Sequence, residues 1–125
     1  MRNIIIGSAI LVVLGLALVL VWRSRPEHYG GEFKGLSPAS IQALVEKPAD
    51  FLKKEFKIEG KVMRQCPSSG CWFYLADSSS KEIKVEMSDA VAKLPTRVGK
   101  MATVEGQLIK FGDEYEFIGS GVEFH

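Results

Sequence analysis

An uncharged run of apolar residues near the start of the chain, from Ile4 to Trp22, constrains its folding more than any other feature. As an α-helix this run would be about 28 Å long, which matches the hydrocarbon core of a bilayer. The run lacks the polar face that a helix on the surface of a soluble protein exposes to water. Trp22 stands at the end of the run, where an indole suits the membrane interface. The run therefore predicts a helix that spans a membrane.

A cleaved signal peptide and a lipoprotein anchor are two other interpretations of this run. No small-x-small cleavage site follows it, because Arg23 ends it abruptly, and it contains no cysteine for a lipid. Arginines flank both ends, so charge alone leaves the orientation open. We expect an uncleaved signal-anchor with its N-terminus inside. That orientation makes the chain a single-pass protein of the inner, cytoplasmic membrane with a periplasmic domain.

The remainder divides into a linker and one domain. Residues 1–25 are expected to form the anchor, the glycine-rich residues 26–36 a linker, and residues 37–125 the domain. Of the 16 basic residues, three flank the apolar run, which leaves 13 basic residues against 15 acidic ones. A mildly acidic domain lacks the positive surface that nucleic acids require, so we expect no nucleic-acid partner.

The domain begins with a short helix and continues with five segments typical of strands, most of them alternating and the one at 72–75 apolar on both faces. We expect Ser37 to cap this helix, Pro38 to begin it and Pro48 to end it. Strands are expected at residues 56–62, 72–75, 83–87, 101–109 and 115–118, with a helical turn at 89–94. This order predicts an all-β fold, a five-stranded OB-fold barrel with short helices, preceded by the transmembrane helix. An open meander of strands is the alternative.

A short internal repeat favours the closed barrel. Ile58-Glu59-Gly60 in the first expected strand resembles Val104-Glu105-Gly106 in the fourth. A glycine in the middle of a strand usually marks a bulge or a sharp bend. We expect these two strands to meet where the barrel closes.

Both cysteines flank one loop between the first two expected strands. Cys66 and Cys71 enclose Pro-Ser-Ser-Gly, a loop short enough to bring the two thiols to disulfide distance. An oxidising compartment would favour the bridge, which would hold Pro67 to Gly70 as a rigid tip beside Trp72. Because the closed loop is small, we expect a stabilisation of only about 2 kcal/mol.

Two other interpretations of the cysteine pair stay open. Two thiolates are half of a tetrahedral metal site, and the thioether of Met63 or Met87 would favour Cu(I); Zn²⁺ is possible, although C-x4-C is not its usual spacing. The other interpretation is a redox catalyst, although dithiol catalysts normally carry C-x2-C at a helix N-terminus.

Aromatic residues follow the cysteine loop directly. Trp72 and Tyr74 share one face of the expected strand, and Phe73 and Leu75 share the other. The surface around the second and third strands is where OB folds bind ligands. Pro67, Gly70, Trp72 and Tyr74 are therefore the candidate binding surface, unless the aromatic side chains fill the core. The sequence contains no complete catalytic set of residues, so we expect a protein that is not an enzyme.

The cysteine hairpin also carries a resemblance. Lys61-Val62, Cys66 and Gly70-Cys71-Trp72, with Val104-Glu105-Gly106 downstream, resemble small exported bacterial OB-fold domains that share a C-x4-C-W hairpin and have no characterised function. A weaker likeness, through the anchor and Leu94-Pro95, is to the haem chaperone of cytochrome c maturation. That family attaches haem through the His of an H-x3-Y motif. Neither His28 nor His125 has a tyrosine four residues on, so covalent haem is not expected.

These features together predict an accessory or binding module at the membrane surface. It would bind a protein partner and serve in cofactor or metal handling or in the assembly of a membrane complex. A thiol-disulfide oxidoreductase using Cys66 and Cys71 and a purely structural interaction protein are the alternatives.

The expected disulfide can be tested on the full chain isolated from membranes. Alkylation before reduction, followed by mass spectrometry, should leave Cys66 and Cys71 unmodified because they are paired in an oxidising compartment. Two alkylated thiols would contradict the bridge. Protection of those thiols by added Cu(I) or Zn²⁺ would favour the metal site instead.

Overall fold

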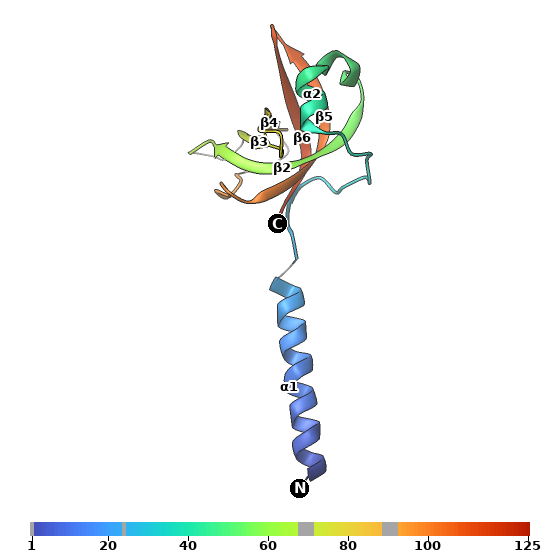
Figure 1. The fold of residues 1–125 in the computed structure, drawn as a ribbon, viewed down its shortest axis with the longest axis vertical. Helices are drawn as coiled ribbons and strands as arrows, with labels where there is room; N and C mark the ends of the chain where they lie inside the picture. Colours follow the sequence, from blue (N-terminus) through green and yellow to red (C-terminus); the bar gives the residue numbers. More distant parts are fainter. Residues whose placement is uncertain (1, 24, 68–71, 89–92) are drawn as a thin grey trace.

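The computed structural model describes residues 2–23, 25–67, 72–88 and 93–125. It contains two α-helices, one 3-10 helix and six strands (Figure 1). In chain order these are α1 (Arg2–Arg23), β1 (Glu27–Gly30), α2 (Ile41–Glu46), η1 (Pro48–Phe51), β2 (Glu55–Gln65), β3 (Trp72–Ala76), β4 (Glu82–Met87), β5 (Met101–Phe111) and β6 (Glu114–Phe124).

Helix α1 stands apart from the strands and leads into them through a short segment (Figure 1). It has 22 residues, and none of them is buried in the protein. Its length and composition are sufficient for it to cross a membrane. The apolar helix predicted from the sequence is therefore present.

Strands β2 to β6 form a closed barrel in the order β2-β3-β4-β6-β5, and β5 pairs with β2 again. All of these pairs are antiparallel except β4 with β6, which are parallel with Val85 opposite Phe117. Strand β2 pairs with β5 through its first half and with β3 through its second half. The predicted OB-fold barrel with short helices is confirmed.

Two glycines allow the long strands to cross closely. A Cβ atom at Gly106 would overlap the backbone carbonyl oxygen of Ile118, and β5 and β6 shift register there. A Cβ at Gly60 would lie 2.8 Å from both the Ala76 carbonyl oxygen and the Ile41 Cδ1 atom. The two strands that carry the repeat, β2 and β5, pair with each other where the barrel closes, as the sequence predicted. The close approaches at the two glycines are to other elements, Ile118 of β6 and Ala76 of β3.

The barrel interior is filled by the alternate apolar residues of every barrel strand. Its largest buried side chains include Phe73, Phe117, Ile58, Leu75 and Leu108. Glu105 is the buried charged residue within the described chain, and its carboxylate accepts hydrogen bonds from the backbone N–H groups of Lys34 (2.6 Å) and Leu36 (2.9 Å). This carboxylate therefore holds the segment before α2 against the barrel.

The structure differs from the sequence expectation in the region before β2. The segment 26–36, expected to be a linker, contains β1, which pairs antiparallel with the end of β6. The helix predicted to begin at Ser37 and Pro38 begins later, and that prediction is wrong. Ser37 and Pro38 instead pair with Lys57 of β2, so they cannot begin the helix. Ser40 is the N-cap, and its hydroxyl accepts a hydrogen bond from the Ala43 N–H. Most of the helical turn expected at 89–94 lies outside the described residues.

Substitution of Gly106 by alanine should destabilise the barrel strongly. The new methyl group would meet backbone rather than a movable side chain, so the free energy of unfolding should fall by roughly 3 kcal/mol. Urea unfolding of the full chain in micelles, followed by near-ultraviolet circular dichroism, measures this loss. Gly15→Ala in α1, where no atom lies within 4 Å of the new Cβ, is the control and should leave unfolding unchanged. Equal stability of the two variants would contradict a close crossing at Gly106.

Candidate functional site

The cysteine loop joins β2 to β3. At its base the Cys66 N–H donates to the Trp72 carbonyl oxygen at 3.0 Å. Cys66 is half-buried and Pro67 is exposed. Gly70 and Cys71 lie outside the described residues, so the disulfide stays a prediction. The structure establishes a paired base on which the loop begins and ends.

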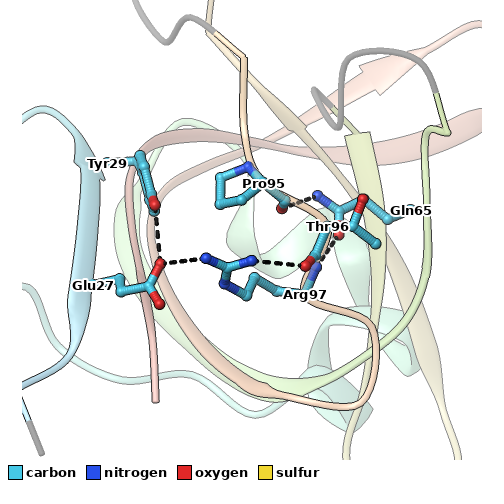
Figure 2. Close-up of polar contacts among 6 residues, drawn as sticks. All are labelled: Glu27, Tyr29, Gln65, Pro95, Thr96 and Arg97. Atoms are coloured by element: carbon cyan, nitrogen blue, oxygen red, sulfur yellow. Dashed lines mark hydrogen bonds and ion pairs between the residues drawn. The ribbon is translucent and has the colours of Figure 1, made fainter. Parts of the chain in front are cut away.

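A side-chain clamp fixes this base to the segment before β5 (Figure 2). Gln65, the last residue of β2, accepts the Arg97 backbone N–H at 2.8 Å through its Oε1 atom. Its Nε2 atom donates to the Pro95 carbonyl oxygen at 2.9 Å. The amide thus offers one donor and one acceptor, as a neighbouring strand would. It connects the cysteine loop to a segment about thirty residues further along the chain.

The same segment is bound to β1 through Arg97. Its guanidinium donates to the Glu27 carboxylate at 2.9 Å and to the Thr96 carbonyl oxygen at 2.9 Å, and the Tyr29 hydroxyl also donates to Glu27 at 2.9 Å (Figure 2). The hydrogen bond from Arg97 lowers the pKa of Glu27 below its usual value. The hydrogen bond to Glu27 in turn raises the pKa of Tyr29. Polar contacts therefore run without a break from the cysteine hairpin to β1.

Trp72 and Tyr74 lie on the outer surface of β3, beside the hairpin. Both are half-buried, whereas Phe73 and Leu75 between them are fully buried in the core. The two outer rings meet edge to face with their centroids 5.9 Å apart. The Arg64 guanidinium lies over the Tyr74 ring at 4.1 Å from its centroid. The strand thus places Trp72 and Tyr74 outside the core, on what we call the aromatic face: Arg64, Trp72, Tyr74 and Lys84.

The cations on this face already have acidic partners. Arg64 pairs with Glu82 at 3.1 Å, and Lys84 pairs with Glu116 at 3.3 Å. Partial burial lowers the pKa of Lys84, but the hydrogen bond and the charge of Glu116 outweigh it and leave the pKa raised. Because each cation has a carboxylate partner, the aromatic face offers little attraction to a phosphate backbone.

A pocket of about 370 Å³ adjoins the aromatic face, between the end of α2, strands β3 and β4, and the β5–β6 turn. Its apolar lining residues are Leu44, Val45, Pro48 and Ile83. Its charged and aromatic residues are Glu82, Asp113, Glu114, Glu116, Lys84, Tyr74 and Tyr115. Four carboxylates against one lysine make this an acidic pocket, which favours basic groups in a ligand.

The thioethers proposed as metal ligands lie in different environments. Met63 is 42% exposed at the bulge between Val62 and Arg64, and Met87 is buried in the core. Within the described ranges, no three His, Cys, Asp or Glu residues are placed to hold a metal ion. Since Cys71 lies outside those ranges, copper or zinc at the cysteine pair stays a prediction.

Both histidines make contacts at the surface. The two ring nitrogens of His28 lie 3.1 Å from Glu123 Oε1 and 2.7 Å from the Gly31 carbonyl oxygen, and His125 Nε2 lies 3.0 Å from Thr103 Oγ1. Sequence reasoning missed the role of His28 in holding β1. It also missed Gln65 and Arg97, because their contacts join distant segments that share no local pattern.

Comparison with known proteins bears on the fold. No protein-family profile and no curated protein matches the chain. Among solved structures, it is similar to a Leishmania major Friedlin protein assigned as an aspartyl-tRNA synthetase, with a TM-score of 0.54 and 14% identity. The match covers 86% of this chain but only 25% of that protein. At this identity the similarity supports the architecture alone.

Replacing Gln65 by alanine should loosen the base of the cysteine hairpin. The variant loses the acceptor for the Arg97 N–H and the donor for the Pro95 carbonyl, at about 1 kcal/mol for each hydrogen bond. Hydrogen exchange on the full chain should show the Arg97 amide exchanging at least about five-fold faster. Gln107→Ala, at an exposed position of β5, should leave that rate unchanged. An unchanged rate in Gln65→Ala would show that the clamp does not hold this segment.

Proposed function

We propose that this chain is a membrane-anchored binding module and not an enzyme. Helix α1 would hold the barrel outside the cytoplasm, and the aromatic face with its acidic pocket would bind a protein partner. The apolar length of α1 supports the anchor. If the helix is a signal-anchor with its N-terminus inside, the barrel lies in the periplasm. Assembly of a complex at the membrane surface is the role this arrangement fits.

One observation carries the proposal: an outward pair of aromatic rings reaches, through Tyr74, a pocket that is rich in carboxylates. Tyr74 lines the pocket and Trp72 packs against Tyr74, and such residues are typical of binding surfaces. Asp113 and Glu114 line the pocket and form no ion pair within the described chain, so they can accept basic groups. The partner expected from this chemistry is a protein segment that carries lysine or arginine beside an apolar residue. The carboxylates of this pocket would repel the phosphates of a nucleic acid.

The placement of Cys66 favours binding over thiol exchange. Cys66 directly follows strand β2, and none of the described helices has its N-terminus at Cys66, where it would stabilise a thiolate. The hairpin instead borders the aromatic face, since Trp72 is the first residue after the loop. We therefore assign the cysteine loop to the shape of the binding surface.

A fluorescence titration tests the binding face. In a Trp22→Phe background of the full chain in micelles, Trp72 is the single remaining tryptophan and reports on the aromatic face. A tryptophan-free peptide that alternates lysine with leucine should change its emission saturably. The combined variant Tyr74→Ala, Asp113→Asn and Glu114→Gln should weaken binding at least ten-fold, because it removes a ring and two charges.

The controls separate this face from general charge effects. Glu32→Gln removes an exposed acid that does not line the pocket and should leave binding unchanged. A peptide with glutamate in place of lysine, and a single-stranded oligothymidine, should bind at least ten-fold more weakly. Tighter binding of either acidic probe, or equal binding by the combined variant, would overturn the proposal.

A further inference from the structure

A second charged pocket lies at the opposite end of β6 from the acidic pocket. Its volume is about 240 Å³, and it is lined by Arg23, Arg25, Glu27, Arg97, Lys100, Phe124 and His125. Four of these side chains are permanently basic and one is acidic, and we call this the basic pocket. Its sign is opposite to that of the pocket beside the β5–β6 turn.

The barrel holds its half of the basic pocket rigidly. Lys100 and Arg97 belong to one turn, closed by the Lys100 N–H on the Arg97 carbonyl oxygen at 3.0 Å. Two backbone bonds fix this turn to β2, from the Gly99 N–H to the Val62 oxygen at 2.8 Å and from the Val62 N–H to the Lys100 oxygen at 2.9 Å. The Glu27 carboxylate orients the Arg97 guanidinium. These two cations are thus positioned by the fold.

The other two cations come from the end of the apolar helix. Arg25 lies two residues before Glu27, which pairs with Phe124, so its Cα stays within roughly 7 Å of a residue fixed on the barrel. Arg23 is the last residue of α1. Figure 1 shows the C-terminal end of the chain beside the segment that leaves α1. If α1 spans a bilayer, this pocket lies at the depth of the lipid headgroups.

The charge in the basic pocket is only partly balanced. Glu27 is paired with Arg97, and among the described residues Arg23, Arg25 and Lys100 have no ion-pair partner. Arg25 lies 5.2 Å from the centroid of the Trp22 ring, which leaves its guanidinium donors available. Guanidinium groups match the geometry of phosphate oxygens, and an ammonium group adds a further donor. The missing counter-charge is therefore a phosphate-sized anion.

We propose that the basic pocket binds the phosphate of an anionic phospholipid headgroup. Free phosphate offers the same chemistry, but the position at the end of an apolar helix favours the lipid. Binding would fix the orientation of the barrel on the membrane and leave the acidic pocket facing away from it. The inference shares the membrane anchor with the proposed function but does not depend on the aromatic face, so the two can fail separately.

Nuclear magnetic resonance of the full chain in maltoside micelles tests this site. Short-chain dihexanoylphosphatidylglycerol should shift the Arg97 and Lys100 amide resonances saturably. The dissociation constant should be at least five-fold lower than for dihexanoylphosphatidylcholine or for inorganic phosphate. Lys100→Ser should raise it roughly five-fold, the effect of one basic charge at an anionic surface. Lys110→Ser, which removes an exposed lysine near the other end of the barrel, should leave it unchanged.

Each remaining outcome overturns the assignment. Absence of saturable shifts at Arg97 and Lys100 would show that the pocket binds no anion. Equal binding of phosphatidylcholine and phosphatidylglycerol would show that the pocket does not distinguish headgroups by their net charge. Tighter binding of inorganic phosphate would assign the pocket to the free anion. Equal effects of Lys100→Ser and Lys110→Ser would reduce the interaction to general electrostatics.

Discussion

The close crossing of β5 and β6 at Gly106 is the constraint on which the rest of the structure depends. The strands approach so closely there that no side chain fits against the Ile118 carbonyl. The eleven-residue strand β6 pairs with β5 along its whole length, with a register shift at this point. On its other edge, Phe117 to Gly119 pair with β4, and the last four residues of the strand pair with β1. The two charged pockets lie at the opposite ends of β6, so the length of this one strand separates them.

The barrel could be predicted from the sequence because its strands obey a simple rule. Alternation with period two placed the strands around Ile58, Val85 and Val104, a short apolar run placed the strand at 72–75, and the glycine repeat indicated where the barrel closes. Strand β1 escaped this reasoning, since four residues are too few to show a period and it is ordered by pairing with a strand far along the chain. Ser37 satisfied the local rules for a helix cap, but pairing of its backbone with β2 displaced the helix start to Ser40.

The candidate site was predictable only in part, for a related physical reason. Trp72 and Tyr74 were identified as a pair on one face, yet a strand that is apolar on both faces does not show which side is inside. The Gln65 side-chain amide forms hydrogen bonds with the backbone of Pro95 and Arg97, as a neighbouring strand would. The period of a sequence does not predict such a contact. The net charge was also uninformative. A total near zero conceals carboxylates gathered at one end of β6 and arginines at the other.

The pairing of β1 with β6 has a mechanical consequence for the anchor. The chain between α1 and β1 is only three residues long, so β1 cannot begin more than roughly 14 Å from the end of the helix. Further along, the Glu105 carboxylate holds residues 34 to 36, so a pull on the helix reaches the barrel through β1 first. A freely jointed tether would let a domain sample a hemisphere above a membrane. Here the connection is too short for that, so the barrel would stay beside the end of the helix and travel with it in the plane of a bilayer.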